Sequence, residues 1–368
     1  MITPFDFKRK YNKYRSEVNS TMQRVLRRGV FILGPELEVF EKSFSTYLNI
    51  PYTVGVNSGT DALFLALKAV GVGHEDEVIT VANTATPTVS AIRMAGATPV
   101  FVDIDEKTFN LDTTKLESKI TKETKAIIPV HLYGYPAEMN SIMKVAKKYK
   151  LFIIEDCCQA HGAEYAGKKV GSFGVMGCYS FYPTKNLGTI GDAGAIVTRD
   201  KKLYEKLKAL RNYGEASKYH NVTEGVNSRL DEIHAAFLSW GLPYLDAWNT
   251  AREHLADLYI KELHGAPLIL PEISSGKVKR VWHQFVIRTD KRDALKKYLA
   301  DHDVITSIHY PMPIFKQPAY KFFGYTDKDL PMTSKAAKEI LSLPLYPELT
   351  NADVRRVCRT IQTFYKEN

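Results

Sequence analysis

Cysteine is scarce in this sequence, and long apolar runs are absent from it. No apolar run reaches the roughly 18–20 residues that a membrane-spanning helix needs, and the opening segment, MITPFDFKRKYNKYR, lacks the apolar core of a signal peptide. The four cysteines show neither metal-type spacing nor a disulfide framework: Cys157, Cys158, Cys178 and Cys358. We therefore expect a cytoplasmic protein with reduced thiols, without a metal site and without a membrane segment.

The sequence also lacks internal repeats, low-complexity segments and the basic clusters interleaved with aromatic residues that mark a nucleic-acid-binding module. Its net charge of +9 is spread over predicted helices such as 144–150 and 201–208. This distribution indicates a solvated surface bias, part of which could attract an anionic substrate. We expect no nucleic-acid partner.

Apolar runs alternate with amphipathic stretches along most of the chain. Strand-like runs lie at 52–56, 78–81, 99–104, 126–132, 151–154, 175–182 and 195–198, and helical patterns at 13–28, 35–48, 84–94, 111–120, 137–149 and 201–211. Such alternation favours a mainly parallel sheet covered by helices on both faces. After about 268 the pattern changes to a strand at 281–288, a helix at 291–301, a strand at 304–309 and a helix at 351–365. We predict an α/β fold with a large domain, residues 1–249, and a smaller C-terminal α+β domain, residues 250–368.

Two charged residues follow neighbouring apolar runs in the segment 151–192. Asp156 comes just after the run 151–154, and Lys185 follows the run 175–182 in the segment SFYPTK. In open α/β sheets the carboxyl ends of strands place groups that bind ligands. A carboxylate and a lysine on adjacent loops suit pyridoxal phosphate (PLP), which needs a lysine Schiff base and an acidic partner for its ring nitrogen. On the pair alone, a solvated lysine remains the alternative.

A second motif, Asn57-Ser58-Gly59-Thr60, lies between a predicted strand and a predicted helix. Free N–H groups and the helix dipole make such a turn an anion site. Plain helix caps made by Ser58 and Thr60 are the alternative interpretation.

Several segments, in this order and spacing, resemble the nucleotide-sugar aminotransferases of the DegT/DnrJ/EryC1/StrS family. They are NSGTDAL, VHLYG, IEDCCQAHGA, SFYPTKNLG, GDAGAIVT, YHNVTEGVNSRLDEIHAAF and IHYPMPIFKQPAY, and they span nearly the whole chain. The resemblance implies the aspartate aminotransferase-like fold of type I. In that fold the large domain binds PLP on a mostly parallel mixed sheet between helices.

The resemblance implies roles for residues around the cofactor. Lys185 would form the Schiff base and, once freed, move the proton between the amino donor and the cofactor. Asp156 would keep the pyridine nitrogen protonated, and Gln159 would bond the phenolic oxygen. His161 matches the family wording, and we interpret it as a hydrogen-bonded structural histidine.

The phosphate group of PLP would be bound by residues from two chains. The resemblance assigns this role to Gly59, Thr60 and Ser180 of one subunit and to Asn227 of a second subunit. A homodimer with shared active sites is therefore expected, and a symmetric dimer is the commonest oligomer.

One position departs from the family pattern. Members commonly carry an aromatic residue, stacked on the cofactor ring, where this sequence has Ala85 in VANTATPT. Alanine offers less contact area and no stacking, so weaker cofactor binding is expected beside Ala85.

Five residues are expected to contact the substrate: Lys218, Tyr219, Arg229, His309 and Tyr310. Basic donors on a mobile loop suit the negative charges of a sugar diphosphate, although surface charges are the alternative. IHYPMPIFKQPAY resembles the branch of the family that aminates dTDP-linked 3-keto-6-deoxy sugars.

The resemblance therefore implies a PLP-dependent aminotransferase of deoxyamino sugar biosynthesis, which supplies lipopolysaccharide or another glycan. L-glutamate would convert PLP to pyridoxamine phosphate, which then aminates a nucleotide-linked ketosugar, and the C3 ketone of a dTDP-3-keto-6-deoxyhexose is favoured. A C4-specific aminotransferase and a non-catalytic regulatory protein are the alternatives. Lys185 argues against a third, the sugar dehydratases, in which histidine replaces this lysine.

Overall fold

A seven-stranded sheet forms the centre of the protein in the computed structural model, which describes residues 1–274 and 276–367. The strand order is β1-β9-β8-β5-β4-β2-β3. The bounds are β1 Tyr52–Val56, β2 Glu77–Val81, β3 Thr98–Val102, β4 Thr124–Ile127, β5 Phe152–Asp156, β8 Met176–Ser180 and β9 Gly194–Thr198. Only β9 runs against its neighbours, β1 and β8, so the sheet is mostly parallel and mixed, as predicted.

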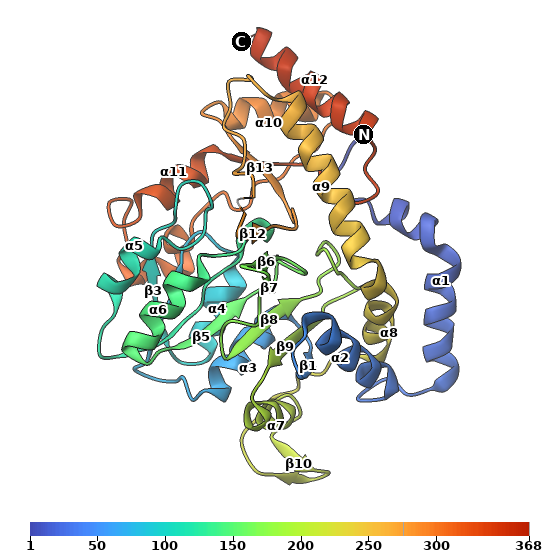
Figure 1. The fold of residues 1–368 in the computed structure, drawn as a ribbon, viewed down its shortest axis with the longest axis vertical. Coiled ribbons are helices and arrows are strands. Elements are labelled where there is room, and N and C mark those ends of the chain that lie inside the picture. Colours follow the sequence, from blue (N-terminus) through green and yellow to red (C-terminus); the bar gives the residue numbers. More distant parts are fainter. Residues whose placement is uncertain (275, 368) are drawn as a thin grey trace.

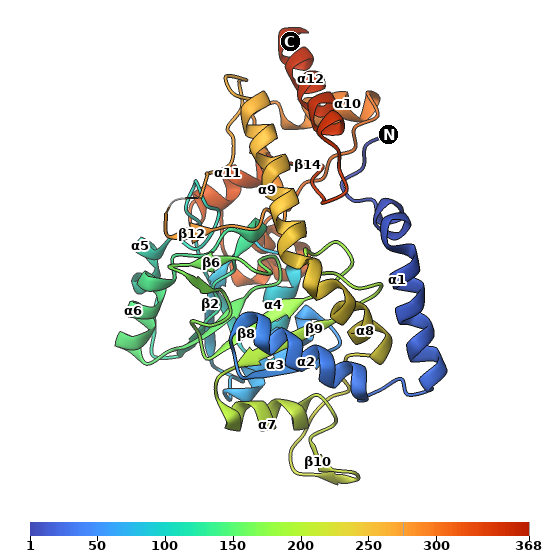
Figure 2. The ribbon, with the colours of Figure 1, turned by 45° about the vertical axis from the view of Figure 1, so that its right-hand side comes forward.

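Helices cover both faces of this sheet (Figures 1 and 2). One face packs against α3 Gly59–Ala69, α4 Thr86–Met94 and α7 Lys201–Leu210, and the other against α2 Pro35–Leu48 and α8 Glu232–Gly241. The alternation of side chains along β8 shows the division, because Cys178 packs with the α3 group and Tyr179 with the α2 group. Apolar residues on both sides of each strand therefore lie in two separate parts of the core.

Shorter elements lie outside the central sheet. They are α5 Thr113–Leu116, α6 Met139–Tyr149, the small strands β6 Glu164–Tyr165, β7 Lys168–Lys169 and β12 Val278–Lys279, and the hairpin of β10 Glu215–Ser217 and β11 His220–Asn221. Short 3-10 helices lie at Glu117–Lys119, Leu132–Gly134, Leu242–Tyr244, Ile314–Lys316 and Pro318–Phe323. The hairpin protrudes beyond α7 at the bottom of Figure 1.

The C-terminal part forms a second core. It contains α9 Leu245–Glu262, α10 Arg292–Asp301, α12 Asn351–Glu367 and the antiparallel pair β13 Phe285–Arg288 and β14 Ile340–Leu343. Helix α11 Pro331–Glu339 instead packs its Ala336 with residues of β2 and β3. Ile2, at the other end of the chain, also packs in this core and forms a bridge with Val304. The predicted division between residues 249 and 250 falls inside α9, and it stays a prediction.

The ends of several elements differ from the sequence prediction for local reasons. Helix α1 runs over Phe7–Arg28, six residues earlier than predicted, because the Asp6 side chain accepts a hydrogen bond from the backbone N–H of Arg9 and caps the helix. The predicted strand 304–309 is wrong: this segment forms only isolated bridges, at Val304 and Ser307. Among the described residues, no helix has the length and apolar character needed to cross a membrane.

Candidate active site

A cavity of about 210 Å³ opens at the carboxyl ends of β5 and β8 and beside the N-terminus of α3. It brings together the predicted cofactor contacts except Asn227. The lining residues are Ser58, Gly59, Thr60, Leu63, Thr84, Ala85, Pro87, Thr88, Val130, Asp156, Cys158, Gln159, Ser180, Tyr182, Lys185 and Asp192.

Asp156 is the last residue of β5, and its carboxylate is buried in the wall of this cavity. The hydroxyl of Thr88 donates to its Oδ2 atom at 2.9 Å, and the N–H of Cys158 donates to Oδ1 at 3.1 Å. Thr88 in turn shares a hydrogen bond of 2.9 Å with Thr84. The carboxylate is thus held by α4 and by its own loop, with lone pairs left for a cationic ligand atom.

Lys185 lies in the turn after β8, where its N–H donates to the carbonyl of Tyr182 at 2.9 Å. Burial lowers the pKa of its amine below the ordinary value, while Cys158 and Asp156 act in the opposite direction. A lower pKa increases the fraction of neutral amine, which is the nucleophilic form.

The turn before α3 is shaped to admit an anion. Ser58 caps the helix by accepting the N–H of Asp61 at 3.1 Å, whereas the N–H groups of Gly59 and Thr60 have no acceptor in the described part of the chain. A Cβ atom on Gly59 would lie 2.6 Å from the Cβ atom of Ser180, so only glycine allows this approach. Free N–H groups beside a serine hydroxyl fit the phosphate of PLP.

Gln159 connects the cavity to two more distant segments. Its Oε1 atom accepts the N–H of Tyr133 at 2.9 Å, and its Nε2 atom donates to the hydroxyl of Tyr310 at 3.3 Å. The hydroxyl of Tyr133 donates to the carbonyl of His309. One N–H of the Gln159 amide therefore remains for a cofactor oxygen, and two predicted substrate residues, His309 and Tyr310, lie directly behind it.

The other predicted substrate residues lie away from the cavity in this chain. Lys218 and Tyr219 are exposed in the β10–β11 hairpin, with Tyr219 84% exposed. Arg229 donates to the side chain of Asn212 at 3.2 Å, and Asn227 is exposed beside it. One chain alone does not bring these residues to Lys185.

His161 is not the hydrogen-bonded histidine that the sequence suggested. Its ring lies against Tyr179 and Phe181, and neither ring nitrogen has a hydrogen-bond partner among the described residues. Burial and the charge of Lys185 lower its pKa to about 3, so the ring is neutral.

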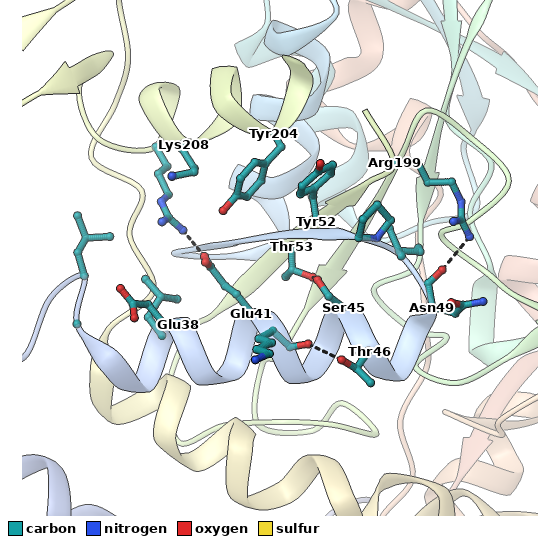
Figure 3. Close-up of a pocket in the computed structure, with 17 residues that line it drawn as sticks. Glu38, Glu41, Ser45, Thr46, Asn49, Tyr52, Thr53, Arg199, Tyr204 and Lys208 are labelled. Carbon is teal, nitrogen blue, oxygen red and sulfur yellow. Dashed lines mark hydrogen bonds and ion pairs between the residues drawn. The ribbon is translucent and has the colours of Figure 1, made fainter. Parts of the chain in front are cut away.

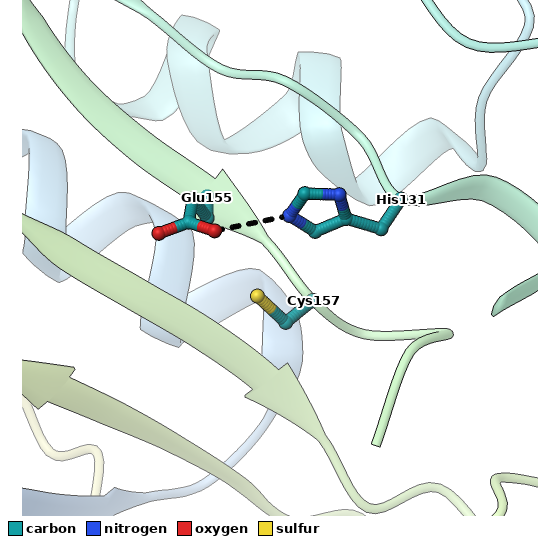
Figure 4. A group of neighbouring side chains, drawn as sticks. All are labelled: His131, Glu155 and Cys157. Carbon is teal, nitrogen blue, oxygen red and sulfur yellow. Dashed lines mark hydrogen bonds and ion pairs between the residues drawn. The ribbon is translucent and has the colours of Figure 1, made fainter. Parts of the chain in front are cut away.

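His131, Glu155 and Cys157 form a buried cluster of the kind that can hold a metal ion (Figure 4). However, Glu155 already accepts the N–H groups of Gly171, Phe173 and Gly174 and a bond of 3.2 Å from His131 Nε2. The other ring nitrogen of His131 accepts the N–H of Ala137. These bonds occupy the ligand atoms of His131 and Glu155, so the cluster is a structural network beside Asp156.

A larger hollow of about 880 Å³ lies between α2, β1 and α7, away from Lys185 (Figure 3). There Glu41 accepts the N–H of Gly55 at 2.7 Å, and Arg211 pairs with Glu41 and donates to the carbonyl of Gly55. These contacts block the exposed edge of β1 against pairing with another strand.

Thr88 and Cys158, which hold the carboxylate of Asp156, are among the site residues that the sequence prediction missed. Thr88 follows Pro87 in the first turn of α4, and a polar residue at the start of a helix was the available signal. Its partner Asp156 is 68 positions away in the chain, so only the sheet reveals the contact.

Residues 12–362 match the family described as the DegT/DnrJ/EryC1/StrS aminotransferase family. The chain is 45% identical over 364 residues to the dTDP-3-amino-3,6-dideoxy-alpha-D-galactopyranose transaminase of Aneurinibacillus thermoaerophilus, covering 99% of each chain. It is 43% identical to a pleiotropic regulatory protein of Geobacillus stearothermophilus, again over 99% of each chain. The crystal structure of S. venezuelae DesV in complex with a ketimine intermediate superimposes with a TM-score of 0.96 at 42% identity, covering 99% of this chain and 98% of that one.

The match extends over both cores and includes the strand ends that carry Asp156 and Lys185. The mostly parallel mixed sheet between helices agrees with the type I fold that the sequence resemblance implied. This chain therefore belongs to the DegT/DnrJ/EryC1/StrS aminotransferase family.

Proposed function

We propose that this enzyme transfers the amino group of L-glutamate to the C3 ketone of a dTDP-linked 3-keto-6-deoxyhexose, with PLP held by Lys185 and Asp156. The observation that carries the proposal is the single cavity that contains a desolvated lysine, a buried carboxylate and a helix N-terminus with free N–H groups. Those three groups match the aldehyde, the ring nitrogen and the phosphate of PLP.

Bound PLP supplies the electron sink for breaking the Cα–H bond of the amino donor. Asp156 places a negative charge against the ring nitrogen, and Thr88 keeps that carboxylate in position. The amine of Lys185, whose pKa is lowered by burial, would accept the proton from Cα of the amino donor and deliver it to C4′ of the cofactor. Gly59, Thr60 and Ser180 hold the phosphate, and Ala85 leaves room beside the ring.

The sugar assignment rests on the relative from Aneurinibacillus thermoaerophilus, whose name specifies a dTDP-3-amino sugar. A C4-specific enzyme is the alternative within the family. The relative named as a regulatory protein supports a second kind of alternative, in which the fold is kept without turnover. The intact pair of Asp156 and Lys185 in a common cavity favours the enzyme.

The substrate and donor can be tested together. The purified protein with PLP, glutamate and a panel of dTDP-, UDP- and GDP-linked 3-keto and 4-keto sugars should release 2-oxoglutarate continuously only with dTDP-linked 3-keto sugars. Turnover with a 4-keto sugar alone would reject the C3 assignment. A protein that binds PLP but releases no 2-oxoglutarate with any sugar would support the regulatory alternative.

A homodimer in which Asn227 of one subunit completes the phosphate site of the other is part of the proposal. Two observations support this arrangement. Asn227 is exposed on the segment that follows the β10–β11 hairpin, and it does not line the cavity of its own chain. The exposed residues Lys218 and Tyr219 would reach the partner's substrate in the same way.

Mixing two inactive variants tests this arrangement. Lys185→Ala and Asn227→Ala proteins, dissociated and reassociated together, should recover about a quarter of the wild-type activity, because half of the dimers are mixed and each has one intact site. No recovery, with mixed dimers confirmed by mass spectrometry, would contradict a shared site.

We also propose that the enzyme acts in the cytoplasm, where nucleotide sugars and reduced thiols coexist. All four cysteines are free in the structure, as expected for a reducing compartment.

A further inference from the structure

The side chain of Asn186, the residue directly after Lys185, is buried and bonded on three sides. Its Nδ2 atom donates to Asn249 Oδ1 and to the carbonyl of Val281, both at 2.8 Å. Its Oδ1 atom lies 3.1 Å from Nδ1 of His283. Since both amide hydrogens are used by acceptors, Oδ1 must face the imidazole and accept its hydrogen.

This contact determines the tautomer of His283. The neutral ring carries its hydrogen on Nδ1, so Nε2 has only a lone pair and makes no hydrogen bond within residues 1–274 and 276–367. Burial and then the positive charge of Lys185 lower the pKa of His283 well below its ordinary value, and smaller contributions come from Arg252, His309 and His161. His283 therefore lies within electrostatic reach of the lysine and stays neutral.

The backbone of His283 is itself held firmly. Its N–H donates to the carbonyl of Tyr133 at 3.1 Å, and its carbonyl accepts a bond of 3.3 Å from the buried guanidinium of Arg252. Arg252 also donates to the carbonyl of Leu345 at 2.9 Å. Arg252 thus connects the backbone of His283 to α9 and to the C-terminal core. The ring of His283 is therefore held in place, and its bond to Asn186 can position the loop that carries Lys185.

We propose that Asn186 and His283 are positioning residues, whose hydrogen bond holds the loop of Lys185 so that its amine faces the cavity. A lysine side chain has several rotatable bonds, and a displacement of about 1 Å at a reacting group can cost roughly 100-fold in rate. Groups behind a reactive residue commonly supply this alignment. The inference depends on the assignment of Lys185 under Proposed function.

The test measures covalent capture of PLP by the cofactor-free, full-length protein. PLP is added, samples are quenched with borohydride over time, and the modified residue is located by mass spectrometry. His283→Leu and Asn186→Ala should each slow attachment at Lys185 by about 10- to 100-fold. His283→Asn should remain within about threefold of the wild type, because its Nδ2 atom can replace Nδ1 as the donor to Asn186.

The double variant decides whether the two residues act through one contact. His283→Leu combined with Asn186→Ala should be no slower than the slower single variant, since the shared bond is lost only once. His254→Leu, which removes an exposed histidine of α9 that is bonded to Asn351 at the start of α12, is the matched control and should not change the rate.

Three results would overturn the proposal: unchanged attachment in both single variants, multiplicative effects in the double variant, or a rate for His283→Asn as low as that of His283→Leu. If His283→Leu does not fold, the other two variants still decide the matter: an unchanged attachment rate in Asn186→Ala, or a rate in His283→Asn that is about 10-fold or more below the wild type, would overturn the proposal. Attachment of PLP to a residue other than Lys185 in the wild type would instead reject the proposed function.

Discussion

Asp156 and Lys185 owe their chemical character to the residues that surround them. The carboxylate is fixed by Thr88 and by the N–H of Cys158, so it does not need to reorganise when a cationic ring arrives. The amine is desolvated, and its pKa is lowered by that burial. One cavity therefore offers a fixed negative charge and an amine whose pKa is lowered toward the nucleophilic form.

Replacing the carboxylate removes the charge while keeping the shape. Asp156→Asn should weaken PLP binding by about 1.5–3 kcal/mol, roughly 10- to 150-fold, because a charge-assisted hydrogen bond to the ring is lost. The dissociation constant can be measured by titrating the visible absorption of PLP into the cofactor-free variant. Unchanged binding and unchanged kcat would remove Asp156 from the site.

Thr88→Val should weaken PLP binding less than Asp156→Asn does. It removes a neutral hydroxyl and leaves the carboxylate, so binding should weaken by about 1 kcal/mol, roughly fivefold. The same absorption titration measures the effect. An effect larger than that of Asp156→Asn would mean that Thr88 acts on PLP otherwise than through Asp156.

Motif spacing predicted the cavity residues Asp156, Gly59 and Lys185, because each follows a strand whose carboxyl end faces the same edge of the sheet. It did not predict the unpartnered ring of His161 or the bond between Asn186 and His283. Asn186 and His283 are 97 residues apart in the chain, and the ring of His161 is placed by its packing against Tyr179 and Phe181. Neither contact leaves a periodic pattern in the sequence.

At the level of elements, the N-terminus of α2 shows how a distant residue fixes a loop. Glu232, fully buried in α8, accepts the N–H groups of Gly34, Glu36 and Leu37 at 2.9–3.0 Å. A carboxylate at this position also complements the helix dipole. The loop that precedes α2 is thereby held in place, although its apolar residues 30–33 are exposed.

Glu232→Gln should destabilise the protein by about 1.5–3 kcal/mol, because an amide is neutral and must turn one donor toward backbone N–H groups. Urea unfolding should show a lower midpoint with an unchanged slope. As a control, Glu38→Gln changes an exposed residue of α2, the helix that Glu232 caps, and should shift the stability by less than about 0.5 kcal/mol. Equal midpoints for Glu232→Gln and the wild type would contradict the capping role.

Helix boundaries marked by proline were predictable, as for α2 Pro35–Leu48, which begins at a proline and ends as expected. The strand β14 Ile340–Leu343 and the irregular segment 304–309 were not, since each is defined by its partners across the C-terminal core. Short apolar runs take their structure from tertiary contacts more than from pattern.

Across the whole molecule, α1 at the start of the chain contacts α9 through a buried charge. Lys10 is 7% exposed, and its ammonium lies 4.0 Å from the ring centroid of Trp248 in α9. Burial lowers the pKa of Lys10 from 10.5 to about 8, against a smaller opposing effect of Glu348.

This shift makes the stability depend on pH in a defined direction. Between about pH 8 and 10.5 the unfolded chain retains the Lys10 proton that the folded protein has lost, so folding becomes more favourable as the pH rises through this window. Lys10→Met should be more stable than the wild type at pH 7, and the difference should decrease by roughly 2–3 kcal/mol by about pH 10. Urea unfolding of both proteins at each pH measures it, and a difference independent of pH would contradict a buried, titrating Lys10.

The central claim is that the amine of Lys185 captures the aldehyde of PLP in the cavity that contains Asp156. Borohydride reduction of the wild-type holoenzyme, followed by digestion and mass spectrometry, tests it most directly. We predict one reduced pyridoxyl group per chain, on the peptide that contains SFYPTK and at Lys185. A label on any other lysine, or no label in a protein that binds PLP and transaminates, would contradict the account.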